Sequence, residues 1–400
     1  MKTTFKLSLY WFFVMGALGV FFPFFSLFLK ENVGLSGGQV GIVLAILPLT
    51  GMFAQPLFGQ IADRSGKRTR LLALLAIGTA FGYLLMPLPA TFCGILLATT
   101  VLALFSSSLI PMGVSVSMAL LAENGLPNFG RVRVFGTIGF LVTVVSTPVF
   151  LDFLFPEKRP ETALFGPSRI GLGFIFVYAA LLVSLAAMVA WLLPREGSVS
   201  SRAAKREYRV LLTHAPFLKV LVVVFLIFFF LQGPLNLFPI LISERGGDTG
   251  TISHMWIFML IPEIPLVACA NRAFGLLSLR FVIAFAALAG GIRSLVCALS
   301  PGLGPLYLAQ MLHGIVVVGL FVGAPQYVER AVPENLRTTG QSLLTMLGAS
   351  TGGIISSSLS GLLYERYGIE APFLLGGIGM IAVGTMAPSL LKQKHQTAAS

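Results

Sequence analysis

The sequence has 400 residues, of which 56% are hydrophobic and 10% charged, and its mean hydropathy is +0.91. A soluble domain carries roughly a quarter of its residues as charged side chains, so this composition excludes a soluble protein and indicates one that lies in lipid. The net charge of +12 would suit nucleic-acid binding. The placement of the basic residues indicates membrane orientation instead, and we expect no nucleic-acid partner.

Long apolar runs recur along the whole chain, and about 20 apolar residues suffice to cross a bilayer. The first run follows two lysines, as in a signal peptide, but it is longer than a signal core and no small-residue cleavage site follows it. We therefore expect it to be a transmembrane helix. Charged and Gly/Pro breaks then predict twelve spans, at 7–29, 38–61, 71–88, 92–121, 132–154, 170–194, 216–242, 251–270, 281–299, 304–327, 338–363 and 371–391.

Basic residues gather in alternate loops between these spans. One set comprises Lys2, Lys6, Arg64, Lys67, Arg68, Arg70, Arg131, Arg133, Arg195, Arg202, Lys205, Arg206, Arg209, Arg272, Arg280, Arg330, Arg337, Lys392 and Lys394. The opposite loops carry only Lys30, Lys158, Arg159, Arg169, Arg245 and Arg366. Because cytoplasmic loops are enriched in Lys and Arg, this bias predicts that both termini are cytoplasmic and that the number of spans is even.

The spans divide into two sets of six. The polar stretch 195–215 predicts a cytoplasmic linker between an N-terminal bundle at 1–194 and a C-terminal bundle with a short tail at 216–400. The residues PNFGR at 127–131 return 206 residues later as PENLR, and the loop at 63–66 has a weaker counterpart 208 residues later, at 271–275. We expect an all-α membrane protein of twelve helices in two pseudo-symmetric six-helix bundles, with a substrate site near the midplane between them.

The loop between the second and third spans resembles the signature loop of the major facilitator superfamily. Its residues are Gly59, Asp63, Arg64, Gly66, Lys67 and Arg68. Gly66 permits a tight turn, and Asp63 can accept hydrogen bonds from a neighbouring helix N-terminus. The resemblance implies a conformational latch that breaks as the two halves rock. The alternative is a solvated basic loop.

Span 7 carries two amides on one helix face, Gln232 and Asn236, which are four residues apart. Pro234 and Pro239 loosen the same segment. Amides suit the hydroxyls of a sugar or the edge of a nucleobase, but they equally suit hydrogen bonds between helices. Both interpretations stay open. The phenylalanines of span 1 are more typical of packing or lipid contact than of a ligand site.

Glu263 lies in the middle of span 8, whereas the other 14 of the 15 acidic residues lie in loops or near span ends. A mid-membrane charge costs at least about 2.5–3.5 kcal/mol, so it usually faces a cavity and has a function. At 1.5 Å per residue, Glu263, Arg293 in span 9 and His313 in span 10 reach similar depths of roughly 14–18 Å. A carboxylate beside a cation stays ionised and takes up a proton when the cation moves away. This trio predicts proton coupling; the alternative is a set of structural hydrogen bonds.

Several motifs are absent from the sequence. No G-x-x-x-x-G-K-[ST] motif for ATP occurs. The histidines at 214, 254, 313 and 395 include no pair at helical metal spacing. Cys93, Cys269 and Cys297 all lie in apolar runs, so we expect them to be buried thiols. We expect no cofactor, no metal and no enzymatic activity.

Within the superfamily, several motifs resemble the group that contains the lactose permease, the nucleoside–proton symporters and the phenylpropionate permeases. These motifs are Met15–Ala17 with Phe22–Phe25, Gln55–Gly59, and Gly130–Gly136 with Thr137–Phe140. The resemblance implies substrate-binding or coupling roles for Arg133, Glu263, Arg293 and His313, and substrate contacts for Thr137 and Phe140; Gln232 and Asn236 match approximately. Two carboxylates of the lactose permease are missing, since Val316 and the segment Gly113–Ser115 stand in their places.

These observations predict a monomeric, proton-coupled symporter of the bacterial inner membrane that imports a small polar solute, with nucleosides or sugars favoured. The alternatives are an importer of aromatic carboxylates, an exporter of drugs or sugars and, more distantly, a membrane sensor that transports nothing.

Overall fold

The structure, a computed structural model, describes residues 3–123, 129–155, 171–194, 210–276 and 278–392. Residues 127–128 of the N-terminal repeat, residues 195–209 of the expected linker and the basic residues at 2, 158, 159, 169 and 394 lie outside these ranges. All elements of the described part are helical, and twelve of its helices are long and apolar enough to cross a membrane. The prediction of an all-α protein with twelve spans is confirmed.

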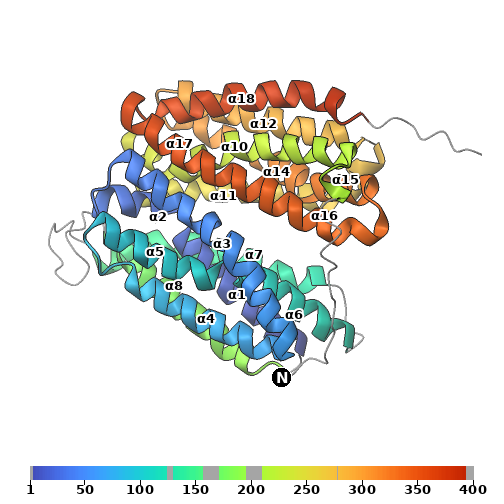
Figure 1. Cartoon of the computed structure of the whole chain (residues 1–400). Helices are drawn as coiled ribbons and strands as arrows, with labels where there is room; N and C mark the ends of the chain where they lie inside the picture. Colours follow the sequence, from blue (N-terminus) through green and yellow to red (C-terminus); the bar gives the residue numbers. More distant parts are fainter. Residues whose placement is uncertain (1–2, 124–128, 156–170, 195–209, 277, 393–400) are drawn as a thin grey trace, which may run out of the picture. The chain divides into compact units, whose positions relative to one another are not determined.

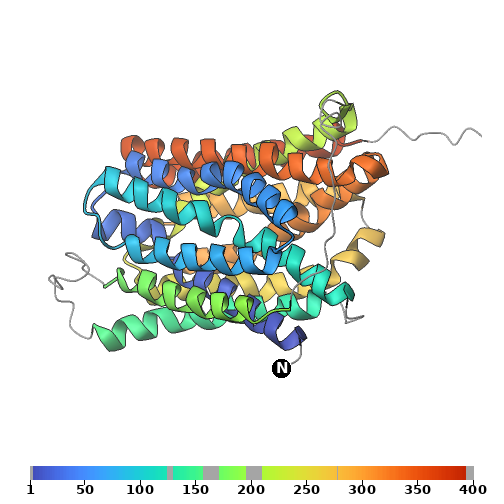
Figure 2. The ribbon, with the colours of Figure 1, turned by 60° about the horizontal axis from the view of Figure 1, so that its bottom comes forward.

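The helices of the first six spans appear in Figures 1 and 2. They are α1 (Thr3–Phe21), α2 (Phe25–Leu27), the π-helix η1 (Phe28–Asn32), α3 (Gly37–Ser65), α4 (Arg68–Leu85), α5 (Phe92–Ser106), α6 (Leu109–Glu123), α7 (Phe129–Leu154) and α8 (Phe174–Trp191). The first span is interrupted after Phe21 because Pro23 has no N–H to donate and disfavours helical backbone at the residue before it.

The remaining spans begin at α10. Their helices are α10 (Ala215–Glu244), α11 (Thr249–Leu276), α12 (Leu279–Leu299), α13 (Gly304–Gln310), α14 (His313–Val317), the π-helix η2 (Val318–Gly323), α15 (Ala324–Ala331), the 3₁₀-helix η3 (Glu334–Leu336), α16 (Arg337–Leu343), the π-helix η4 (Leu344–Ser350), α17 (Thr351–Tyr367) and α18 (Glu370–Leu390). The tenth span is thus composed of several short segments, and His313 lies immediately after its first interruption.

The chain forms two compact units. One consists of Met1–Ser201 with Pro239–His254, and the other of Arg202–Phe238 with Met255–Ser400. The expected boundaries 1–194, 195–215 and 216–400 stay a prediction, and they differ from these units in the placement of Pro239–His254. Within the first unit, this segment donates two hydrogen bonds, from Ser243 to the carboxylate of Glu31 and from Ser253 to the carbonyl of Val144.

Close helix packing through glycine organises each unit. In the first, α1 lies against α7 and α8. A side chain at Gly139 would collide with the backbone of Phe12 in α1. In the second, α12 lies against α18, and a Cβ at Gly291 would lie 3.0 Å from the carbonyl oxygen of Gly377. Small residues allow such close approach between membrane helices, whose association depends on packing.

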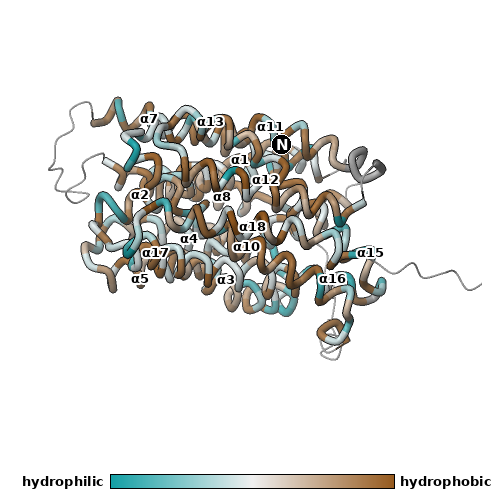
Figure 3. The backbone as a smooth tube through the Cα atoms, turned by 90° about the horizontal axis from the view of Figure 1, so that it is seen from above, coloured by the Kyte–Doolittle hydropathy of each residue, from teal (hydrophilic) through white to brown (hydrophobic). Residues whose placement is uncertain are grey.

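The surfaces of the helices are apolar. Figure 3 shows hydrophobic colours along most of the helical tube. Large side chains such as Phe53 and Phe153 are 70% and 79% exposed, respectively. A soluble protein rarely exposes so many large apolar groups, so these residues are suited to face lipid. Because an apolar run has such an outer face, the expectation of buried thiols is wrong for Cys93 and Cys269, which are exposed, and confirmed for Cys297.

Candidate functional site

The polar centre of the second unit begins at Glu263 in α11. Pro262 and Pro265 flank it within the helix, and each proline removes a backbone N–H and disturbs the carbonyl four residues before it. A Cβ added at Gly314, in α14, would lie 2.9 Å from the Cα and 3.0 Å from the backbone nitrogen of Glu263. The tenth span therefore touches the backbone of the eighth at the glutamate itself, and His313 precedes the point of contact.

Arg293 of α12 lies on the other side of His313. Its side chain is buried, and Nη1 lies 3.3 Å from Oε1 of Gln310 and 3.4 Å from Nδ1 of His313. On the far side of the imidazole, Nε2 lies 3.9 Å from Oε2 of Glu263. The structure thus brings together the three ionisable residues that the sequence placed at one depth, and it adds Gln310 to them.

An interruption of the tenth span explains why Gln310 and His313 reach the same guanidinium. The amides of Met311 and Leu312 donate to carbonyls three residues earlier, and so does that of Ile315. This is the hydrogen-bond pattern of a 3₁₀ turn, in which side chains three residues apart lie one above the other. Gln310 ends α13 and His313 begins α14, so the tight turn aligns both side chains toward Arg293.

The contacts among Arg293, His313 and Glu263 determine which ring nitrogen of His313 carries the hydrogen. A guanidinium has N–H donors and no acceptor, so Nδ1 of His313 accepts from Arg293. The hydrogen of a neutral imidazole then lies on Nε2, on the side of Glu263; this assignment follows from the hydrogen-bond network. The distance of 3.9 Å to the carboxylate is longer than a direct hydrogen bond.

Gln310 holds Arg293 at the buried end of the series of contacts that runs from Glu263 through His313. The residue is fully buried, and its Nε2 lies 3.2 Å from the carbonyl of Leu306 and 3.7 Å from the sulfur of Cys297. Because Nε2 makes these two contacts, the amide is oriented with its acceptor oxygen toward Arg293. Gln310 was not predicted from the sequence, although its position three residues before His313 was a usable signal.

The amides of span 7 also bond one another and a neighbouring helix. Nε2 of Gln232 donates to Oδ1 of Asn236 at 3.0 Å, and Nδ2 of Asn236 donates to Ser357 of α17 at 3.1 Å. The backbone N–H of Gly233 donates to Ser356 at 2.7 Å. The interhelical hydrogen bonding that we held open is therefore present, and a contact with substrate by these amides stays a prediction.

In the first unit, Arg133 lies over the indole of Trp11, with its guanidinium carbon 4.9 Å from the ring centroid. Arg133 lies only one turn into α7, close to the end of its span, as its position in the sequence implied. Thr137, one turn further on, is partly exposed, and Phe140 is buried. The substrate contacts of all three stay predictions.

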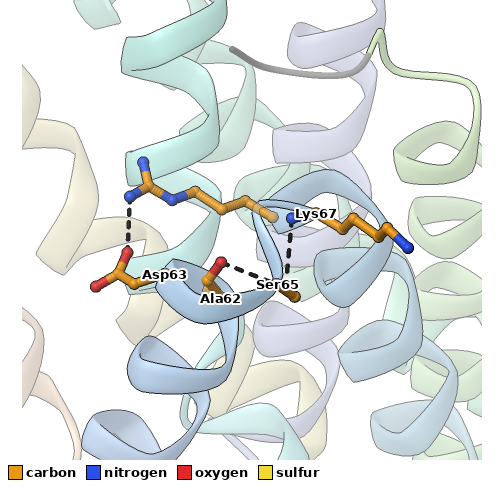
Figure 4. A network of polar contacts seen from close by, with 5 residues as sticks. Ala62, Asp63, Ser65 and Lys67 are labelled. Atoms are coloured by element: carbon orange, nitrogen blue, oxygen red, sulfur yellow. Dashed lines mark hydrogen bonds and ion pairs between the residues drawn. The ribbon is translucent and has the colours of Figure 1, made fainter. Parts of the chain in front are cut away.

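The loop after α3 has the expected turn (Figure 4). Gly66 adopts φ of 61°, in the left-handed region that favours glycine, and its N–H donates to the carbonyl of Ala62. Asp63 accepts from Nη2 of Arg68 at 2.7 Å. We expected the backbone of a helix N-terminus as the donor; the turn at Gly66 instead brings the side chain at the start of α4 within reach. A Cβ added at Gly59 would meet no atom within 4 Å, and Arg64 and Lys67 are exposed.

The position that carries a glutamate in the lactose permease is apolar in the structure as well as in the sequence. Val316 is buried in the core of the second unit, close to the backbone of Gly290. A carboxylate there would be placed among apolar side chains. Among the described residues, no group of three or more His, Cys, Asp or Glu side chains is arranged to hold a metal ion.

Twelve apolar spans, glycine-mediated helix contacts and a buried chain of polar groups define an integral membrane transporter. The family model described as MFS_1 like family matches residues 4–375. The chain therefore belongs to this family of major facilitator transporters. The maltose permease of Geobacillus stearothermophilus is 30% identical over 99% of this chain and 96% of its own length. The lactose permease of Klebsiella oxytoca is 22% identical over 94% and 91%.

Solved structures agree on the fold. The crystal structure of a mutant of the nucleoside transporter NupG matches with a TM-score of 0.86 and 15% identity, over 98% of this chain and 100% of that chain. At this identity the likeness supports the fold alone. Since the relatives are permeases, the chain is a transporter of small-molecule substrates in a membrane and not an enzyme.

Proposed function

We propose that this protein is a proton-coupled symporter that imports a sugar across the bacterial inner membrane, with both termini in the cytoplasm. The observation that carries the proposal is the chain of contacts from Glu263 through His313 to Arg293. A carboxylate in the middle of a span is expensive to maintain and is usually part of an ion pathway. The similarity to a maltose permease along nearly the whole chain favours a sugar.

In this proposal Glu263 carries the proton. Beside the Arg293–His313 pair its carboxylate is ionised, and this charge opposes the movement of a carrier that holds substrate without a proton. The empty carrier returns with the carboxylate ionised and stabilised by His313 and Arg293. Binding of a proton, together with substrate, removes the charge and permits the transporter to alternate between its two orientations. The Nε2–H of His313 stabilises the ionised carboxylate, and Arg293, held by Gln310, fixes the imidazole in the required orientation.

Substrate recognition in this proposal rests on polar groups in both units. Arg133 and Thr137 supply donors from the first unit, while Gln232, Asn236 and Glu263 supply donors and acceptors from the second; Phe140 supplies an apolar face. Sugar hydroxyls suit such a mixture, because each hydroxyl both donates and accepts. The loop from Gly59 to Arg68 acts as a latch that breaks and re-forms during transport.

A second candidate is nucleoside import. The segment Arg133–Phe140 is similar to that of nucleoside–proton symporters, and span 7 carries paired amides that suit the edge of a nucleobase. Sugar and nucleoside import are distinguished by uptake of radiolabelled maltose and uridine into the same proteoliposomes.

The test of coupling uses purified protein in proteoliposomes with and without an inward proton gradient. We expect the gradient to drive accumulation by the wild type. Glu263→Gln should abolish gradient-driven accumulation yet retain exchange of labelled for unlabelled substrate, because a permanently neutral side chain removes the coupling alone. The control is Glu329→Gln, which neutralises an exposed glutamate at the end of α15. Unimpaired accumulation by Glu263→Gln, or uptake indifferent to the gradient, would refute the proposal.

A further inference from the structure

A buried tryptophan in the first span is locked by a hydrogen bond to the fourth. Trp11 of α1 has no exposed surface, and its Nε1 donates to Oγ of Ser117 at 3.0 Å. Ser117 is itself fully buried in α6. An indole N–H placed in an apolar interior requires an acceptor, and this pairing also prevents rotation of the ring. The plane of the indole is therefore fixed relative to both α1 and α6.

Helix α7, the fifth span, covers this ring with two side chains of one face. Phe129 meets Trp11 edge to face, with ring centroids 5.6 Å apart and an interplanar angle of 71°. Arg133, one turn later, lies over the ring at 4.9 Å. The guanidinium also fills the space beside Gly136, where an added Cβ would lie only 2.7 Å from Nη1 of Arg133. The indole of Trp11, the serine that holds it and the absence of a side chain at Gly136 all contribute to the position of Arg133.

We propose that Trp11, held by Ser117, is the positioning residue for Arg133 in substrate binding. The inference rests on the proposed role of Arg133 as a substrate contact, and it extends that role to two residues with no assigned function. Trp11 acts through Arg133 and need not touch the substrate.

The indole limits where the guanidinium can lie. An aromatic ring attracts a cation through the face of its π system, so a ring held in one orientation favours one position of the guanidinium above it.

The test compares transport kinetics of variants in proteoliposomes, with radiolabelled maltose and uridine as parallel probes. Trp11→Leu removes the aromatic face, and we expect KM to rise about tenfold with little change in Vmax, the effect of losing a partly buried cation–π contact. Trp11→Phe keeps a face and should restore KM to within about threefold of the wild type. Ser117→Ala releases the indole, and Gly136→Ala brings a Cβ within 2.7 Å of Nη1 of Arg133 and 2.8 Å of Cγ of Met15 while it leaves Trp11 in place; both should raise KM.

The matched control is Trp191→Leu, because Trp191 is 62% exposed at the end of α8 and should leave KM unchanged. In an Arg133→Gln background, Trp11→Leu should add nothing further, since there is no guanidinium left to position. If Arg133→Gln alone leaves KM unchanged, the proposed substrate role of Arg133 fails. The positioning role fails, and the function of Arg133 stands, in either of two cases. In the first, Arg133→Gln raises KM while Trp11→Leu, Ser117→Ala and Gly136→Ala do not. In the second, the effects of Trp11→Leu and Arg133→Gln on KM simply add.

Discussion

Replacement of Gly314 by alanine tests whether the contact between the eighth and tenth spans sets the geometry of the polar centre. The added Cβ would lie 2.9 Å from the Cα of Glu263, 3.0 Å from its nitrogen and 2.8 Å from Cδ1 of Leu266. Two of these neighbours are backbone atoms, which cannot move aside by rotation of a side chain. The helices themselves must separate, and His313 moves with the tenth span.

The magnitude follows from these distances. Ordinary carbon–carbon contacts lie at about 3.5–4.0 Å, so relief of the overlap requires a separation of roughly 0.5–1 Å. Overpacking of this kind costs typically about 1–3 kcal/mol. The distance from Nε2 of His313 to Oε2 of Glu263, now 3.9 Å, would increase beyond the reach of a modest helix movement. We therefore expect a loss of coupling that exceeds the loss of folded protein.

The assay is gradient-driven uptake in proteoliposomes beside thermal unfolding of the same protein in detergent. Gly314→Ala should reduce accumulation at least about tenfold while it lowers the unfolding temperature by a few degrees. Gly323→Ala is the control in the same span, since its nearest neighbour would lie at an ordinary 3.4 Å. Wild-type accumulation by Gly314→Ala would refute the view that this contact sets the Glu263–His313 geometry.

Three further predictions concern other parts of the chain. Gln310→Leu removes one of the two acceptors of buried Arg293 and should destabilise the protein by about 1–3 kcal/mol, measured by thermal unfolding. Unchanged stability and uptake would show that Gln310 does not hold the arginine. Gly66→Ala places a side chain at φ of 61° and should lower the free energy of unfolding by about 1 kcal/mol. It should also slow transport, measured as the initial rate of uptake. Gly34→Ala, at φ of 76° in another loop, is the control and should lower stability alone. Asp248 accepts hydrogen bonds from the backbone and hydroxyl of Thr251, which lower the pKa of its carboxyl. Its stabilisation is therefore present above the ordinary carboxyl pKa and is lost as pH falls through the lowered value. Asp248→Ala should cost about 0.5–1 kcal/mol near pH 7, a helix-cap value reduced for solvent exposure, and progressively less in acid; a difference independent of pH would contradict this origin.

The sequence predicts the helices well because the bilayer imposes a length on each apolar run, and all twelve spans recur in the structure. It also predicts the depth of Glu263, Arg293 and His313, since depth follows from counting residues along a helix. Their contacts depend on which way each side chain points, and that direction is set by tertiary features. The 3₁₀ turn at Met311 and Leu312 contains neither Gly nor Pro, so no local signal marks it.

Other contacts could not be read from the sequence because they join distant segments. Trp11 and Arg133 lie in different spans, and nothing in the pattern around either residue indicates the other. The partner of Asp63 was missed for a different reason. A helix N-terminus and an arginine side chain at that terminus satisfy a carboxylate equally well, and only the turn geometry at Gly66 decides between them.

In the proposed mechanism Glu263 is the one carboxylate in the middle of a span, and this limits how steeply the protein concentrates its substrate. One carboxylate carries one proton in each cycle. One charge crossing the membrane releases about 2.3 kcal/mol per 100 mV, and each 1.36 kcal/mol corresponds to a factor of ten. The inside-to-outside concentration ratio of a neutral solute can then reach about 50 for every 100 mV of proton-motive force and no more. A steeper concentration ratio at the same proton-motive force would require a second proton for each substrate molecule.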